Sequence, residues 1–490
     1  MLPRLPLQML SEHPVAPRRR GLWKGRKRHT SDSHYHNHRP AKRHRSEDTS
    51  EYSDDGYYLV EFTPEPSPGC DMDSDDDHCA VEESPPEDWE DLKTSFARAA
   101  EQYENDNAAE SIQLLRGVLR LCHRFLLLYQ DPSLLYAEPR AKTPEPAAAV
   151  LVPMSPRTRK KCKCKESPTA FHSILGTTLF LFGNIVSQDA SLVLPDEPAT
   201  PVTYWLAAVD VFEMGENLPS RTSGRGCEAP EDWRMNVVWG RVLLCIADAA
   251  LTQQQHPPTK TISPERKWPS PSASVFAAIQ MRRPPASRRI SLTTAVPHEL
   301  LLLAMDLFTR AIFLMPHAAP EGASCPSKPA IPYSRAAELF TIAVETLALA
   351  ERLPAAAERI RWAAWADNIL GQIPAQAQTA VVARARGRCW LVYGTAHVED
   401  LEAMGEADGW DAEVYNSEDA EDAREGLERA IGYFERDDIR MGEEEDTELR
   451  AFLAEALVTL ANLTREQDKR EDLYRRAQLL GCVALDEMED

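Results

Sequence analysis

The stretch that decides the fold is Leu300-Leu-Leu-Leu-Ala-Met-Asp-Leu-Phe-Thr-Arg-Ala-Ile-Phe-Leu-Met-Pro316. Ala304, Phe308 and Ala311 place two small side chains and one aromatic ring on the same face of a helix. Pro316 stands just past the end of that helix. Small residues let a second helix approach closely, and the ring fills the gap beside them. The second helix of a tetratricopeptide-like repeat has this pattern.

The same pattern recurs in other parts of the chain. One match would fit any packed pair of helices, because alanine is common in helices. Four matches in one chain indicate stacked helix pairs, and Leu175-Gly176 resembles the close-packed point of a repeat's first helix. No segment alternates as strands do. We therefore predict an all-α, tetratricopeptide-like helical-repeat array (an α-solenoid). The further packing positions are Ala208, Phe212 and Gly215; Ala336, Phe340 and Ala343; and Ala423, Leu427 and Ala430.

Composition narrows the possible function classes. The 490 residues include 55 basic and 77 acidic side chains, a net charge of −22, which argues against a dedicated nucleic-acid-binding domain. The closest of the ten cysteines, Cys162 and Cys164, have no second ligand cluster, so we expect free thiols and no zinc site. No run of 18 apolar residues or signal-peptide pattern is visible, so we expect no membrane span and an intracellular location.

The N-terminal tail is divided into two tracts of opposite charge. Residues 17–45 carry eleven lysines and arginines against one acid, and residues 46–91 carry eighteen acids with no lysine or arginine. We expect residues 1–88 to be disordered, because they cannot offset the entropy of ordering. Import receptors read basic clusters of this kind, although a solvated tail without a reader has the same composition. The candidate import residues are Arg18, Arg19, Arg20, Arg26, Lys27, Arg28, Lys42, Arg43 and Arg45, with Lys160 and Lys161 in a second basic run.

The helical-repeat domain is expected to span residues 89–480. Proline-rich or strongly charged sequence predicts disordered insertions at 131–168, 253–292 and 397–416. Residues 481–490 are expected to form an acidic tail. The domain is therefore predicted to be a set of helix pairs separated by long, unstructured connections.

The sequence contains none of the common catalytic motifs. The chain lacks the phosphate-binding loop, the nucleophile elbow, the zinc-protease helix and the dinucleotide-binding turn. His397-Val398-Glu399 has the spacing of an iron-binding facial site, but such sites lie on strands and this sequence is helical. We therefore predict no catalytic residue, no cofactor, no metal site and no enzymatic activity.

Several segments resemble the fungal enhancer of translation termination family. The likeness covers roughly residues 90–480, with gaps at the first two insertions. The acidic tract 46–91 and the insertion 253–292 depart from the family pattern. The segments that carry the resemblance are 111–119 (SIQLLRGVL), 171–180 (FHSILGTTLF), 204–215 (YWLAAVDVFEMG) and 453–478 (LAEALVTLANLTREQDKREDLYRRAQ).

This resemblance implies a nuclear, all-helical protein without enzymatic activity that helps translation to terminate correctly. A relative in the family binds and restrains a 2-oxoglutarate-dependent prolyl hydroxylase of a ribosomal protein, which connects it to hypoxic gene regulation. The implied partners are such a hydroxylase, translation-termination factors and an import receptor. The resemblance carries over no individual binding residue.

Two other function classes stay open. The first is a generic repeat scaffold, such as a co-chaperone that holds an acidic C-terminal peptide. It would need a row of lysine, arginine and asparagine on its inner helices, and the C-terminal helices are acidic instead. A helical RNA-binding protein would use the basic tracts, and its affinity would fall steeply with salt.

Overall fold

Helices dominate the part of the chain that the structure describes. The computed structural model describes residues 85–136, 166–218, 232–255, 274–282, 290–292, 294–317, 334–404, 414–436 and 443–486. These residues lie within one unit of the chain, and a second unit, residues 26–83, lies outside them. All the candidate import residues also lie outside the described ranges, so their role stays a prediction.

The prediction of an all-α fold is confirmed in the described residues, which contain helices and no strand. Short 3₁₀ turns lie at Pro132–Leu135 (η2), Ala190–Leu192 (η3), Ala375–Ala377 (η4) and Val414–Asn416 (η5). The α-helices are α1 (Pro85–Glu104), α2 (Ala108–Leu128), α3 (Ala170–Gln188), α4 (Pro201–Glu216), α6 (Trp233–Gln255), α7 (Val275–Arg282), α8 (Pro297–Leu314), α9 (Arg335–Ala350), α10 (Ala356–Gly371), α11 (Ala380–Met404), α12 (Glu418–Phe434), α13 (Glu443–Asn462) and α14 (Gln467–Asp486).

Helix starts follow local sequence signals. The Ser334 hydroxyl accepts a hydrogen bond from the Ala337 N–H at 3.3 Å, and Ser417 accepts one from Ala420 at 3.2 Å. Both serines satisfy a backbone donor that the first helical turn leaves free. Pro297 opens α8, where its missing N–H costs nothing.

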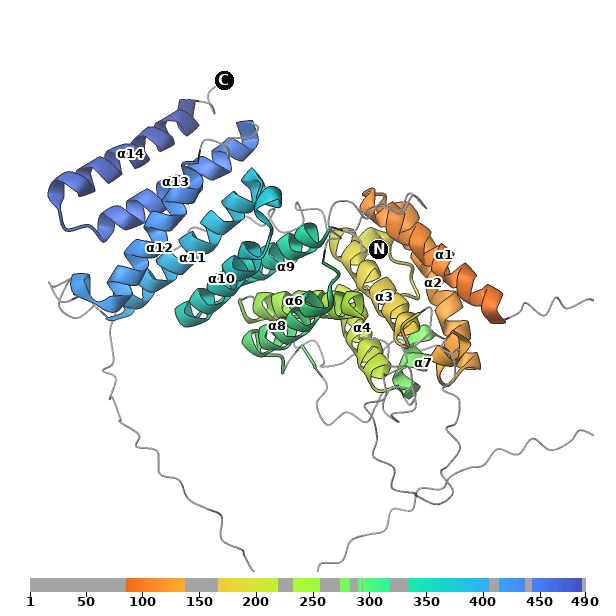
Figure 1. Cartoon of the computed structure of the whole chain (residues 1–490). Coiled ribbons are helices and arrows are strands. Elements are labelled where there is room, and N and C mark those ends of the chain that lie inside the picture. The colour runs from red at the N-terminus through yellow and green to blue at the C-terminus, as the bar shows by residue number, and fades with distance from the viewer. Residues whose placement is uncertain are drawn as a thin grey trace, which may run out of the picture. The chain divides into compact units, whose positions relative to one another are not determined.

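Helices that follow one another in the sequence pack as pairs, and the pairs pack on one another in order (Figure 1). The pairs are α1 with α2, α3 with α4, α6 with α8, α9 with α10, α11 with α12 and α13 with α14. Neighbouring pairs meet through α2 and α3, α4 and α6, α6 and α9, α10 and α11, and α12 and α13. This succession is that of a helical-repeat array.

A glycine facing a phenylalanine ring sets the distance within three pairs. A Cβ on Gly176 of α3 would overlap the Phe212 ring of α4. A Cβ on Gly240 of α6 would lie 2.5 Å from the Phe308 ring of α8, and one on Gly387 of α11 would lie 2.5 Å from the Phe434 ring of α12. A Cβ atom essentially never lies this close to a non-bonded carbon atom, so only glycine leaves room for the ring at each point.

Nine of the twelve predicted packing residues lie on second helices, and all nine are buried: Ala208, Phe212, Gly215, Ala304, Phe308, Ala311, Ala423, Leu427 and Ala430. The other three lie on α9, which pairs with the later helix α10 and is therefore the first helix of its pair. On α9 the small-aromatic-small pattern therefore stands on the first helix of a pair. Ala343 is buried, whereas Ala336 and Phe340 are only half-buried against the core.

The predicted insertions differ from the structure at their ends and in one interior segment. Within 253–292, α7 packs on α2 and α4 and buries Phe276 and Ile279. Within 397–416, α11 continues to Met404 and buries Leu401. Helix α1 also begins before residue 89, and α14 extends past residue 480. Composition hides such elements, because a few apolar residues are diluted by the charged or proline-rich sequence around them.

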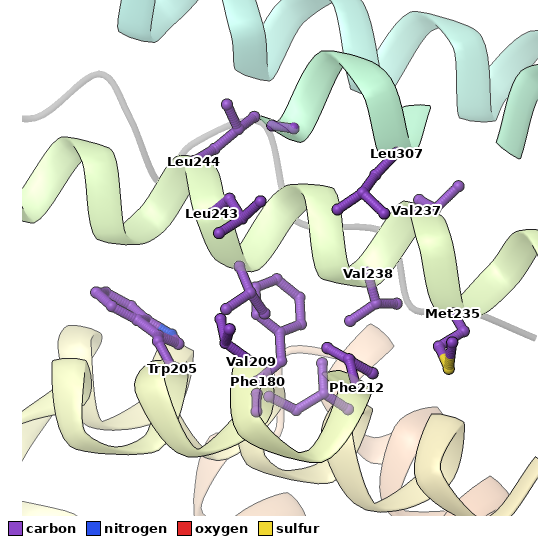
Figure 2. Packing of buried hydrophobic residues seen from close by; sticks show 14 of the residues in the cluster. Phe180, Trp205, Val209, Phe212, Met235, Val237, Val238, Leu243, Leu244 and Leu307 are labelled. Carbon is purple, nitrogen blue, oxygen red and sulfur yellow. The ribbon is translucent and has the colours of Figure 1, made fainter. Parts of the chain in front are cut away.

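The core consists of two hydrophobic clusters that share α11. Figure 2 shows part of the first, where side chains of α4 such as Trp205 and Phe212 face side chains of α6 such as Val238 and Leu243. Cys389 of α11 belongs to this cluster, whereas Leu391, Val398 and Leu401 belong to the second, which continues through α12, α13 and α14. The 25-residue helix α11 therefore joins the two clusters.

Two described helices, α3 and α6, are long and apolar enough to cross a membrane by length and composition alone. Their apolar windows are 89% and 72% buried inside the protein. A core helix can be equally long and apolar, because it buries its apolar side chains against neighbouring helices.

Replacing Gly176 by alanine should destabilise the protein, whereas the same change at Gly117 of α2 should stabilise it. A methyl group on Gly176 would overlap the buried Phe212 ring, and overpacking of this kind costs about 1–3 kcal/mol. No heavy atom lies within 4 Å of a Cβ on Gly117, so Gly117→Ala should add roughly 0.5–1 kcal/mol of helix propensity. Urea denaturation of both variants measures the two effects. A Gly176→Ala variant as stable as Gly117→Ala would contradict the close-packing role.

Candidate protein-binding groove

A groove with a volume of about 660 Å³ lies among η5, α12, α13 and α14. We call it the C-terminal groove. It exists because α12 presents one face to α11 and another to solvent. Ala423, Leu427 and Ala430 are buried, which leaves Arg424 and Glu428, four residues apart, to line the groove.

The floor of the C-terminal groove is apolar. Leu460 and Leu463 are buried at the end of α13, and Leu473 of α14 is half-buried beside them. The chain turns sharply here, because the Leu463 N–H donates to the Leu460 carbonyl at 3.1 Å and the Thr464 hydroxyl donates to the same carbonyl at 2.8 Å. The turn brings α14 back along α13 and fixes the leucines below the opening.

Charged side chains of both signs form the rim. Arg424 donates to the Tyr415 carbonyl at 3.0 Å, and the Arg465 guanidinium lies 5.1 Å from the centre of the Tyr415 ring. Lys469 pairs with Glu466 at 2.9 Å, with both side chains about two-thirds exposed. Exposed pairs of this kind contribute about 0–1 kcal/mol to stability, so they can exchange partners at little cost when a ligand arrives.

Sequence reasoning did not find this groove. Its rim residues come from three helices and a 3₁₀ turn, and each helix alone has the composition of a solvated face. Asp468, Lys469 and Asp472 stand at the start of α14, where acidic residues are common for reasons of helix polarity. Only the turn after α13 brings these charges to the buried leucines.

The His397-Val398-Glu399 motif lies on α11, and the Glu399 carboxylate is held by Arg359 of α10. His397 is buried, with its Nδ1 atom 3.7 Å from Asp419. In the described ranges no group of three or more histidine, cysteine or acidic side chains could hold a metal ion.

A polar network is buried between the first two helix pairs. The Asn184 side chain of α3 accepts a hydrogen bond from the Trp205 indole at 3.1 Å and contacts the Tyr103 hydroxyl at 3.4 Å. Burial raises the pKa of Tyr103. A hydrogen bond offsets the free energy that each buried polar group loses when it leaves water. The groups can keep these partners only in one arrangement, so the network holds α1, α3 and α4 in one register.

His172 is a second buried titratable group, on α3 beside Gly215 of α4. Burial lowers the pKa of the imidazole to about 4. The Asp131 charge opposes this shift and the Arg282 charge adds to it. The folded protein therefore holds His172 neutral at physiological pH.

The comparisons with known proteins are limited. No family model matches the chain, and no curated protein sequence matches it. Solved structures of the S. pombe nuclear import adaptor Nro1 are similar in fold at low identity. One, described as showing that the hypoxic regulator of sterol synthesis Nro1 is a nuclear import adaptor, is 11% identical, has a TM-score of 0.45 and covers 81% of this chain and 88% of its own.

Two further Nro1 structures, in different crystal forms, have TM-scores of 0.43 and 0.40 at 11% and 13% identity. Each covers 81% of this chain, with 93% and 91% of its own length. This chain is an all-α helical-repeat protein by its own helix pairing, and its function has to be argued from its own residues.

The His172→Leu variant should have a flatter dependence of stability on pH than the wild type. In the unfolded chain a histidine binds a proton below about pH 6.5, whereas the buried imidazole binds one only below about pH 4. The unfolded state holds more protons in this window, so wild-type stability is lost as the pH falls from 6.5 towards 4. Between pH 7 and 4.5 the wild type should lose roughly 2–3 kcal/mol more than the variant.

Urea denaturation at both pH values measures this difference, and the carboxylates common to both proteins cancel in it. Parallel pH profiles for the two proteins would show that His172 does not control the loss.

Proposed function

We propose that this protein is a non-enzymatic adaptor that binds a segment of a protein partner in the C-terminal groove. The proposal is carried by the groove itself, in which leucines form the floor and weakly paired charges of both signs form the rim. Protein-binding sites have this composition, with an apolar centre for affinity and a polar edge for register. Helix pairs stacked in order give the groove a rigid support.

The partner class is proposed from the sequence resemblance. The residues similar to the enhancer of translation termination family include 453–478, which forms the end of α13 and most of α14 and so lines much of the groove. On this basis we propose a 2-oxoglutarate-dependent prolyl hydroxylase or a translation-termination factor as the partner. Binding would act by occupancy, because a covered surface on the partner is unavailable to its other ligands. The consequence would be a change in translation termination or in hypoxic gene expression.

Charge reversal at the rim should remove partner binding without unfolding the protein. The Arg465→Glu/Lys469→Glu double variant lowers the net charge on one edge of the groove by four units. The exposed ion pairs that it removes contribute only about 0–1 kcal/mol each to the stability of the fold. The matched control is Arg310→Glu on α8, which breaks the exposed pair with Asp306 far from the groove lining. Affinity purification with mass spectrometry first identifies the partner, and titration with the purified partner then gives Kd.

The double variant should weaken binding at least tenfold, and Arg310→Glu should leave it unchanged. Recovery of a 2-oxoglutarate oxygenase or a release factor would support the partner class that the family resemblance implies. Recovery of chaperones alone would favour a generic scaffold. Equal affinity of all three proteins would place the binding surface outside the C-terminal groove.

We also propose that the basic tract directs the protein to the nucleus through an import receptor. Alanine at Arg18–Arg20 and Arg26–Arg28 should reduce nuclear accumulation and leave the melting temperature unchanged, because the described helical unit does not include these residues. Fluorescence microscopy of tagged wild type and variant measures the change. Persistent nuclear signal would assign import to Lys160–Lys165 or to neither tract, and a matched variant with alanine at those residues separates the two.

A further inference from the structure

A second groove lies on a different face of α12, between that helix and α11. It has a volume of about 370 Å³ and shares no lining residue with the C-terminal groove. We call it the arginine–aromatic groove. Its lining residues are Arg386, Trp390, Arg429, Gly432, Tyr433 and Arg436.

The groove is built from two pairs of residues spaced four apart on neighbouring helices. The Arg386 guanidinium of α11 lies 5.2 Å from the centre of the Tyr433 ring of α12. In the reverse direction, the Arg429 guanidinium of α12 lies 4.4 Å from the centre of the Trp390 ring of α11. Each ring therefore fixes the position of a cation from the other helix.

Carboxylates behind the groove orient the same arginines. Asp367 of α10 accepts from Nε of Arg386 at 2.7 Å and from Nη2 at 3.1 Å, and Glu425 pairs with Arg429 along α12. A guanidinium has five N–H donors, so Arg386 keeps donors beyond the two that Asp367 uses. Arginines held in this way lose little side-chain entropy when they bind an anion.

The lining contains three arginines and no acid, in a chain whose net charge is −22. Asp367 and Glu425, which lie outside the lining, offset part of this positive charge. The guanidinium donors that Asp367 leaves unused on Arg386 still favour an anionic ligand, because a planar guanidinium fork fits a carboxylate. The small volume fits a few side chains of a peptide. A long polyanion such as RNA would also meet the acidic first turn of α12, at Glu418, Asp419 and Glu421, which opposes its approach.

Gly432 supplies an independent observation. No heavy atom of the described residues lies within 4 Å of a Cβ at this position, unlike Gly387 and Gly426, where neighbouring atoms lie at 2.5 and 3.0 Å. Glycine inside a helix costs about 1 kcal/mol relative to alanine, and packing among the described residues does not require it here. Gly432 is exposed and lines the groove, so the absent side chain leaves this part of the groove open.

We propose that the arginine–aromatic groove binds an acidic peptide segment of a partner protein, with its carboxylates on the arginines and its backbone over Gly432. The rings of Trp390 and Tyr433 provide apolar contact beside the charges. This site is separate from the C-terminal groove, and its failure would leave the proposed function of that groove intact.

The test uses the full chain and a fluorescein-labelled peptide with four glutamates on each side of a tyrosine. Its control is the same peptide with glutamines. The Gly432→Glu variant places a carboxylate at the groove, and its Cβ meets no heavy atom of the described residues within 4 Å. The matched variant is Gly117→Glu, at a helix glycine that also has no neighbour within 4 Å. Fluorescence anisotropy gives Kd, and thermal unfolding checks the fold of each variant.

We expect the wild type and Gly117→Glu to bind the glutamate peptide at least tenfold more tightly than the glutamine peptide. Gly432→Glu should reduce that affinity at least tenfold with no loss of melting temperature, and Gly432→Lys, of similar size and opposite charge, should reduce it less. Absence of binding by the wild type, or equal affinity of the wild type and Gly432→Glu, would overturn the proposal.

Two further outcomes would assign the groove to another occupant. Tighter binding of an eight-nucleotide uridine RNA than of the glutamate peptide would make it a nucleic-acid site. Stronger competition by a peptide of residues 46–83 than by the glutamate peptide would give the groove to this chain's own acidic tract. Either result would overturn the proposal of a partner's segment.

Discussion

The close approach of two helices at a glycine is the constraint on which the structure depends. At Gly176, Gly240 and Gly387 the first helix of a pair has no side chain, and a ring from the second helix occupies the space. Phe212 and Phe308 are almost completely buried there, so each ring exchanges water for dense packing on all sides. A single methyl group at these points would overlap the ring, so the ring or one of the two helices would have to shift.

Arginines of one helix cap the carboxyl end of a neighbouring helix. Helices such as α2, α3, α4, α8 and α9 have no basic residue in their last turn. The last carbonyls of these helices therefore need hydrogen-bond donors from elsewhere. Arg335, the first residue of α9, donates to the Ile312 and Met315 carbonyls at the end of α8, at 2.9 and 3.0 Å. Arg282 of α7 does the same for the end of α2.

One ion pair is buried more deeply than these caps. Arg241 of α6 meets Glu345 of α9 with Nη2–Oε1 and Nε–Oε2 distances of 2.6 and 2.8 Å. Both charges are largely excluded from water, so removing either partner would leave the other uncompensated. The pair therefore fixes which face of α9 meets α6. The hydrophobic clusters supply affinity between helix pairs, and such polar contacts supply the register.

The sequence predicted the repeat architecture because its signal is local. Ala304, Phe308 and Ala311 are within eight residues, so their common face is visible without coordinates. The signal does not distinguish the two helices of a pair, because a small-aromatic-small face also occurs on α9, which pairs with the later helix α10. Helix α7 was missed, because four buried apolar residues in an eight-residue helix do not stand out from the sequence around them.

The two grooves could not be predicted for a different reason. Arg386 and Tyr433 are 47 positions apart, and their contact depends on the register of α11 against α12. That register is set by the Gly387–Phe434 contact, which lies one residue away on each helix. Sequence patterns show which residues share a helix face. They do not show which cation faces which ring across two helices.

Helix α12 shows how packing and recognition share one element. Its buried face consists mainly of small residues, and a Cβ on Gly426 would lie 3.0 Å from the Tyr393 ring of α11, so the two helices approach closely. A narrow buried face leaves much of the helix circumference to solvent. Arg424 and Glu428 occupy one part of that circumference, and Arg429, Tyr433 and Arg436 occupy another. The small residues that allow close packing thus also provide the surface on which two separate grooves are built.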